Sequence, residues 1–475
     1  MESNSRVFDW ESQNQFARLS GDYNPIHIDP IAARRTRVGA PIVHGVHSLI
    51  WILERLARSG HDLSGAKTLR VKFVHPIYVG DAVRLDTSNS SQSATRARIL
   101  FGETEVVVAS IGFKDPPPTP LPERLAGCRR MIPPGSPNDI GLEEMHGLRG
   151  HLAFGLGVSE IETLFPAAVQ SLGLPRIAAL VSSSCLVGMV VPGLHSMFLG
   201  LEMSMSNGAG GVEDGIEFSV LSITPRFRAV RIGLRGEGIQ GTLETVSRLQ
   251  PVSQPSMDNV RRVVSRDEFQ GANALVVGGS RGLGELTGKL VAAGGGRVLV
   301  TYVSGKADAD RVVDEISKVS ASCKSMPYDI RQPAAEQLAA IELPPTHIYY
   351  FATPHIFRHK GSMFDIARWN EFNQFYVSGF FDLVAECARL RPNGIRVFYP
   401  STILVDSKPG TSTEYAMSKA AAEVLCRDIS VLLPAVKVLT RRLPGLPTDQ
   451  TSSVVPGKGL DTIEVLLPIV REMHA

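Results

Sequence analysis

At 475 residues, the chain is long for one domain and predicts two or three, each with room for its own hydrophobic core. Its 49 basic and 47 acidic residues nearly cancel, so the net charge of +2 gives no reason to expect nucleic acid or an anionic membrane as a partner. The five cysteines are widely scattered, which excludes a CxxC pair and a disulfide framework, and no metal site is predicted.

The start of the chain is polar and has no apolar stretch behind a basic end, so a secretory signal is not expected. The expected location of the enzyme is the cytoplasm. The most apolar window, Leu180 to Leu201, is interrupted by serines and by Pro192 and His195. It is typical of a buried helix and turn rather than of a membrane span.

The first predicted segment, residues 1–115, contains Gly-Asp-Tyr-Asn-Pro-Ile-His-Ile-Asp at 21–29, followed by Ile-Val-His-Gly at 42–45. The string fixes the Asp22 carboxylate and the His27 imidazole five residues apart. Adding water to an activated double bond, or removing it, needs acid and base groups that differ in their environments. An isolated aspartate or histidine is more often a cap or a surface residue, but the full string favours catalysis.

These residues resemble the signature of the MaoC-like (R)-specific enoyl thioester hydratases and dehydratases, which have the hotdog fold. The resemblance implies that Asp22 and His27 hold one water and work at the α and β carbons of a thioester. Gly45, at the start of the central helix, would donate its N–H to the thioester oxygen. The other histidines nearby, His44 and His47, are expected to pack or cap.

The second predicted segment, residues 116–255, follows a proline cluster typical of a stiff connector. The Gly-Val-His-Ser string at Gly45 recurs 148 residues later as Gly-Leu-His-Ser at Gly193, and Pro76 is matched by Pro225. This internal similarity predicts an α+β double hotdog, two sheets that each wrap around one apolar helix. The two helices are expected at about Pro41–Arg58 and Val190–Met205.

The second copy is expected to be degenerate. The residue 148 positions after Asp22 is Gln170, and the sequence around it has neither the acid nor the histidine of the first copy. One active site per pair of repeats is therefore predicted. In the eukaryotic-type hydratases that this arrangement resembles, the active copy is usually the second, whereas here it is the first.

The third predicted segment, residues 256–475, opens with an apolar strand, a glycine turn and the start of a helix at 274–285. Small residues there allow a backbone to approach a pyrophosphate, and the helix offers its N-terminal N–H groups. The next strand ends without an acid for the ribose hydroxyls, while Arg281 and Lys306 are available for a 2′-phosphate, which favours NADPH over NADH. Asp329 is expected near the adenine.

Later in this segment, Tyr415 and Lys419 stand four residues apart on one helix face, where a cation would lower the tyrosine pKa. With the glycine turn, this resembles the short-chain dehydrogenase/reductase family and implies an α/β, Rossmann-like, doubly wound parallel sheet. Thr402 or Ser401 would polarise the substrate carbonyl, and Tyr376 stands where the family usually has a helix asparagine. The implied cofactor-binding residues are Gly278, Ser280, Arg281, Gly282, Leu283, Gly284, Asp329, Tyr415 and Lys419.

Together these motifs predict a bifunctional enzyme of acyl-thioester metabolism, with NADPH-dependent reduction of a 3-oxoacyl thioester and dehydration of the 3-hydroxy product, or the reverse hydration. Two alternatives stay open: a hydratase whose reductase-like segment does not turn over, and a non-catalytic module that binds thioesters or carrier proteins. The expected partner is a thioester of coenzyme A or of an acyl carrier protein. A homo-oligomer also stays open.

Overall fold

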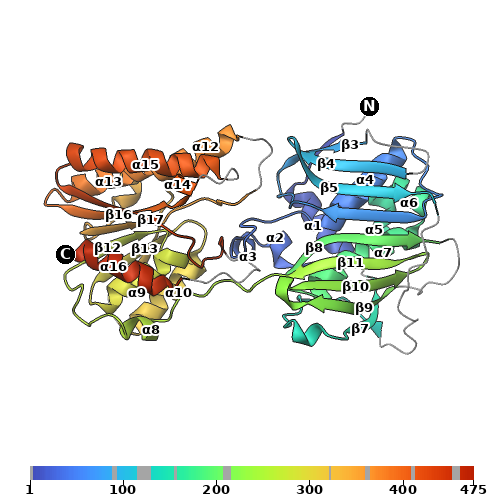
Figure 1. Cartoon of the computed structure of the whole chain (residues 1–475), viewed down its shortest axis with the longest axis horizontal. Helices are drawn as coiled ribbons and strands as arrows, with labels where there is room; N and C mark the ends of the chain where they lie inside the picture. Colours follow the sequence, from blue (N-terminus) through green and yellow to red (C-terminus); the bar gives the residue numbers. More distant parts are fainter. Residues whose placement is uncertain are drawn as a thin grey trace. The chain divides into compact units, whose positions relative to one another are not determined.

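The computed structural model describes residues 4–87, 94–114, 130–154, 158–206, 215–319, 323–358, 364–407, 412–451 and 460–475. Within these residues the chain forms two compact units, one that runs to Gln250 and one that begins at Pro251 (Figure 1). The division lies five residues before the predicted change at 255/256. The proline cluster predicted to separate the two hotdog copies lies outside the described residues.

The first unit is built on one eleven-stranded sheet, ordered β1-β3-β4-β5-β2-β8-β11-β10-β9-β7-β6. The first copy and the second copy of the hotdog meet at β2 and β8, which pair antiparallel from Thr68 opposite Ser204 to Lys72 opposite Gly200. The strands are β1 (Ser5–Val7), β2 (Thr68–Phe73), β3 (Ala82–Asp86), β4 (Ala94–Phe101), β5 (Thr104–Gly112), β6 (Arg130–Met131), β7 (Arg149–Ala153), β8 (Ser196–Met205), β9 (Gly215–Thr224), β10 (Ala229–Gly236) and β11 (Ile239–Ser247).

Each copy packs one long apolar helix against this sheet. In the first copy it is α4, whose side chains from Val46 to Leu53 are all buried. In the second copy it is α7, which continues as a π-helical turn, η2. The helical elements are α1 (Trp10–Ser20), α2 (Pro25–Ile28), α3 (Pro30–Arg34), α4 (Gly45–Arg58), η1 (Glu143–Met145), α5 (Val158–Leu164), α6 (Pro166–Leu172), α7 (Leu174–Cys185), η2 (Leu186–Val190) and η3 (Pro225–Phe227).

The double hotdog is confirmed, but the predicted helix at Val190–Met205 is wrong. Pro192 has no N–H and Gly193 has a φ of +75°, so the helical stretch ends at Val190. Strand β8 follows, and its residues 201–205 alternate between buried and more exposed. The Gly-x-His-Ser strings therefore do not occupy equivalent positions, because Gly45 begins the central helix and Gly193 follows it. The two prolines are not equivalent either, since Pro76 lies between β2 and β3, and Pro225 lies between β9 and β10.

The second unit has a six-stranded parallel sheet in the order β14-β13-β12-β15-β16-β17. Numbered within the unit, this is 3-2-1-4-5-6, the order of the Rossmann fold. The predicted doubly wound sheet is thus confirmed. Its strands are β12 (Asn273–Val277), β13 (Arg297–Tyr302), β14 (Cys323–Pro327), β15 (His347–Tyr350), β16 (Ile395–Thr402) and β17 (Val436–Leu443).

Helices cover both faces of this sheet and enclose two apolar cores. One core takes side chains from α8 (Met257–Arg261), α9 (Gly282–Ala293), α10 (Lys306–Ser317) and α16 (Thr462–His474). The other takes them from α11 (Ala334–Leu338), α12 (Ile366–Asn373), η4 (Gln374–Ser378), α13 (Gly379–Leu390) and α15 (Thr413–Leu432), while α14 (Leu404–Ser407) is a short surface turn.

Among the described residues, no single helix is both long and apolar enough to span a membrane. One pair meets the length and composition criteria only when its members are joined, namely α6 with the stretch Leu174–Val190, and the pair is bent by 117°.

Candidate active sites

The loop that carries the predicted acid and histidine is shaped by consecutive helix caps. Helix α1 ends at Ser20 and is capped by Gly21, whose φ of +74° is a left-handed conformation that glycine adopts at little cost. Asn24 then caps α2 by accepting the Ile26 N–H, and Pro25 occupies the first helical position. Asp22 lies between these caps, so the backbone on both sides of it is fixed.

The Asp22 carboxylate is enclosed, with 2% of the residue exposed. Its Oδ1 accepts the Asn24 N–H at 3.1 Å, and its Oδ2 accepts the Ser184 hydroxyl at 2.7 Å. Burial raises the pKa of Asp22 above its ordinary value, while His27 and these two hydrogen bonds pull that pKa down. Ser184 belongs to the second copy, so both copies shape the environment of the acid.

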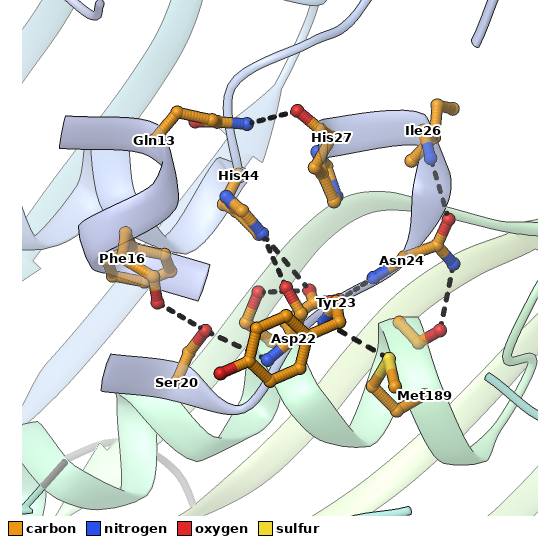
Figure 2. A network of polar contacts seen from close by, with 12 residues as sticks. Gln13, Phe16, Ser20, Asp22, Tyr23, Asn24, Ile26, His27, His44 and Met189 are labelled. Atoms are coloured by element: carbon orange, nitrogen blue, oxygen red, sulfur yellow. Dashed lines mark hydrogen bonds and ion pairs between the residues drawn. The ribbon is translucent and has the colours of Figure 1, made fainter. Parts of the chain in front are cut away.

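Two histidine rings, those of His27 and His44, stack beside Asp22 with centroids 3.9 Å apart (Figure 2). His27 Nδ1 lies 2.7 Å from the Ile42 carbonyl oxygen, and His44 Nε2 lies 3.0 Å from that of Asp22. A carbonyl oxygen only accepts hydrogen bonds, so both nitrogens carry a hydrogen. A neutral His27 therefore keeps its lone pair on Nε2, the ring atom that can accept a proton.

Burial also sets the charge of these rings. It lowers the pKa of His27, although the Asp22 charge acts against this, and it holds the pKa of His44 well below its ordinary value. One nitrogen or oxygen atom from each of Asp22, His27 and His44 lies within 4.8 Å of the others. The structure thus brings the predicted acid and histidine together in one buried site.

A cavity that is partly open to solvent borders the pair. Asp22, His27 and Gly45 line it from the first copy, and Ser184 and Phe198 line it from the second. The remaining walls are mostly apolar, which is the environment expected for an acyl group next to a few polar atoms.

Gly45 is the first residue of α4, where the backbone N–H groups have no acceptor within the helix. A Cβ at this position would lie 3.0 Å from the Phe73 ring, so a larger residue fits only if that ring shifts. The position suits a donor to an oxygen that gains negative charge, although the donor role of Gly45 stays a prediction.

Sequence reasoning missed three residues of this site. His44 was expected to pack or cap, but its ring also donates to the Asp22 carbonyl. The buried Gln13 amide donates to the carbonyl oxygens of His27 at 3.1 Å and of Ile42 at 2.8 Å and so joins the two segments. Ser184 lies 162 residues from its partner, Asp22, and nothing in the local sequence pairs them.

The second copy has no loop like that of the first. In the first copy, residues 21–44 separate α1 from α4, whereas residues 165–173, which contain α6, separate α5 from α7. Gln170 lies on α6. This shorter stretch holds neither an acid nor a histidine, as expected for a copy without the catalytic pair.

In the second unit, β12 runs into the glycine turn. Gly278 has a φ of +78° and Gly282, the first residue of α9, one of +58°. A Cβ on Gly284 would lie 2.3 Å from the Gly278 carbonyl oxygen, and one on Gly278 would lie 2.9 Å from the Phe351 carbonyl carbon. The tightness of the turn before a helix N-terminus fits a bound pyrophosphate.

The basic residues predicted to contact a 2′-phosphate already have acidic partners. Arg281 pairs with Asp449 at 2.8 Å, and Lys306 pairs with Asp310 at 2.7 Å. Asp329, which follows β14, pairs with Arg331 at 2.7 Å. The preference for NADPH and the position of the adenine therefore stay predictions.

The two hydroxyls that the sequence left open point to different partners. The Thr402 hydroxyl is close enough to Tyr415 to pull its pKa down, whereas Ser401 donates to Glu423, which also binds Arg442 at 2.6 Å. Successive residues of β16 face opposite sides of the sheet, which explains the division. Thr402 is thus the hydroxyl beside the tyrosine.

The expectation that Lys419 lowers the pKa of Tyr415 is wrong. Burial raises the pKa of Tyr415 to about 12 and lowers that of Lys419 to about 7, because removal from water disfavours both charged forms. The Lys419 ammonium donates to the Pro400 carbonyl oxygen at 2.7 Å and lies 4.0 Å and 4.6 Å from the ring centres of Tyr376 and Tyr399.

Known proteins resemble the first unit in sequence. Residues 2–110 match the family described as MaoC like domain. An (R)-specific enoyl-CoA hydratase of Aeromonas caviae is 39% identical over 72 residues, which are 14% of this chain and 52% of that protein. The peroxisomal multifunctional enzyme type 2 of Mus musculus is 38% identical over 84 residues, which are 16% of this chain and 11% of that protein. The matches thus cover about half of one relative and a tenth of the other.

Among solved structures, a short chain dehydrogenase of Escherichia coli CFT073 complexed with NADPH is similar over 44% of this chain and 94% of its own, with 18% identity and a TM-score of 0.39. The second unit itself shows the strand order, the glycine turn and the Tyr415–Lys419 helix described above. Residues 2–110 of the chain thus match a MaoC like domain, and the second unit has the strand order of the Rossmann fold.

Proposed function

We propose that the chain is a bifunctional acyl-thioester enzyme. The first unit would catalyse (R)-specific hydration of a 2-enoyl thioester or dehydration of the 3-hydroxyacyl form, and the second would reduce a 3-oxoacyl thioester with NADPH. The observation that carries the proposal is the buried Asp22 side chain beside His27, whose Nδ1 lies 2.7 Å from the Ile42 carbonyl oxygen, at the wall of a largely apolar cavity. Similarity to an (R)-specific enoyl-CoA hydratase and to a 3-hydroxyacyl-thioester dehydratase supports it.

In the hydration direction, Asp22 and His27 would hold one water molecule. The water oxygen forms a bond to the β carbon while His27 Nε2 takes a proton from the water. The resulting imidazolium is stabilised by the Asp22 carboxylate and gives the same proton to the α carbon. The N–H groups at the start of α4, Gly45 first, would stabilise the negative charge on the thioester oxygen between these steps.

In the second unit, the glycine turn would hold the cofactor pyrophosphate against the start of α9. The cofactor supplies the hydride when it is bound. Tyr415 keeps its proton at neutral pH because burial raises its pKa, so its phenol would protonate the carbonyl oxygen, with Thr402 donating to the same oxygen.

A single assay panel tests both halves. The purified chain is expected to remove the ultraviolet absorbance of a crotonyl thioester and to oxidise NADPH in the presence of an acetoacetyl thioester. Use of coenzyme A and carrier-protein thioesters of several lengths would identify the substrate. If neither signal changes on any thioester, the proposal is wrong and a non-catalytic binding module is favoured.

A second candidate function is a hydratase whose reductase-like unit binds the cofactor without turnover. It is favoured by the surroundings of Lys419, whose amino group already donates to the Pro400 carbonyl oxygen and lies over the rings of Tyr376 and Tyr399. NADPH binding without oxidation, together with normal hydration, would support this alternative over the bifunctional enzyme.

The two hydroxyls of the second unit are expected to respond differently to mutation. Thr402→Ala removes the group beside Tyr415 and should lower the kcat for acetoacetyl thioester reduction by about 10²-fold, the loss typical of an oxyanion donor. Ser401→Ala leaves Glu423 paired with Arg442 and should change kcat less than about threefold. NADPH oxidation rates measure both, and the reverse order would show that Ser401 is the active hydroxyl.

A further inference from the structure

The central helix of the second copy reaches directly into the acid–base pair. Near the end of α7, the Ser184 hydroxyl donates to Asp22 Oδ2 at 2.7 Å, although the two residues lie 162 positions apart in the sequence. Ser184 is 4% exposed and Asp22 is 2% exposed. The bond is thus formed between two enclosed side chains, where a hydrogen bond to a charge is worth more than at the surface.

The π-helical turn η2 that follows α7 also contacts the Asp22 carboxylate and the residues next to it. A Cβ added to Gly188 would lie 2.2 Å from Asp22 Oδ1, so only glycine fits there. The Gly188 carbonyl accepts the Asn24 side-chain amide at 2.8 Å, and the Met189 sulfur accepts the Tyr23 N–H at 3.2 Å. Each residue from Asp22 to Asn24 therefore contacts the second copy.

We propose that Ser184 is a positioning residue for hydration, because its hydroxyl orients the Asp22 carboxylate and favours the ionised form of it. The copy without the catalytic pair would in this way supply part of the acid–base machinery. The inference rests on the proposed hydratase activity.

The physical argument concerns which form of Asp22 the site favours. Burial favours the neutral acid, and a hydrogen bond donated to the carboxylate opposes that effect. The other titratable groups that face Asp22 are His27 from α2, His44 at the start of α4 and Cys185 on α7, and Arg248, which follows β11, acts on His27. All of them remain when the Ser184 hydroxyl is removed.

The test is the pH dependence of hydration by the full chain. In Ser184→Ala, the carboxylate loses one donor, so its pKa rises and the acid limb of the kcat/KM profile for a crotonyl thioester should move up by about one pH unit. At pH values on that limb the rate should fall about tenfold. The matched control is Ser183→Ala, since Ser183 is also buried on α7 but donates to the Leu180 carbonyl.

Ser184→Thr keeps the hydroxyl and should leave the acid limb at its original pH, which separates the hydrogen bond from a loss of packing. The inference is overturned if the Ser184→Ala profile coincides with that of Ser183→Ala, or if the threonine and alanine variants shift the limb equally. If the unmodified chain does not hydrate any enoyl thioester, it is instead the proposed function that fails.

Discussion

Asp22→Asn is expected to lower the rate of enoyl thioester hydration by about 10²- to 10⁴-fold, the contribution usual for a general acid–base group. Asparagine has nearly the same shape but carries no charge, so it cannot stabilise the imidazolium that forms when His27 takes a proton. The loss of crotonyl thioester absorbance measures the effect, and NADPH oxidation by the second unit should be unchanged.

Asp29→Asn is the matched control for this variant. Asp29 lies in the same motif, but it is exposed and caps α3 by accepting the N–H groups of Ile31 and Ala32, a role that asparagine also fills. Its hydration rate should stay near that of the unmodified chain. Equal rates in Asp22→Asn and Asp29→Asn would remove Asp22 from the mechanism.

Tyr415→Phe is expected to lower NADPH oxidation with an acetoacetyl thioester by about 10²- to 10⁴-fold. Burial raises the pKa of Tyr415 to about 12, so below that pH the phenol holds the proton that reduction requires, and phenylalanine has none to give. Initial rates of NADPH oxidation measure the change.

The hydratase serves as the internal control, since Tyr415→Phe should leave crotonyl thioester hydration intact while Asp22→Asn should leave reduction intact. A reductase rate that survives the loss of the Tyr415 hydroxyl would place the proton donor elsewhere. Absence of NADPH oxidation in the unmodified chain would instead support the hydratase with a non-reducing second unit.

The parts of the fold and site that the sequence predicted are those formed by residues close together in the sequence. Asp22 and His27 lie within one turn-rich motif, whose glycine, asparagine and proline residues also form the caps that hold it. The glycine turn is similarly local, because Gly278 and Gly284 contact each other. Spacing along the chain was enough to predict both places.

What the sequence could not show depends on contacts between distant segments. Ser184 is one of three consecutive serines on α7, and only the packing of the two copies selects it to face Asp22. The ion pair between Arg281 and Asp449 spans 168 residues and was likewise invisible. The wrong helix prediction at Val190–Met205 had another cause. It followed from the short string that Gly45 and Gly193 share, although Pro192 and Gly193 favour the end of a helix.

The sequence also did not show how deeply Tyr415 and Lys419 are buried. The spacing of Tyr415 and Lys419 suggested a cation that lowers the tyrosine pKa, but the enclosed position of both groups reverses the result for the phenol. Whether a charge effect or a burial effect dominates depends on the depth of each group below the surface, which four residues of spacing do not reveal.

The antiparallel pairing of β2 with β8 places β2 in the interior of the eleven-stranded sheet. Separation of the two copies would turn β2 into an edge strand with a row of unsatisfied N–H and C=O groups from Thr68 to Lys72. An isolated first copy would therefore be prone to self-association through this strand, which the second copy covers in the joined chain.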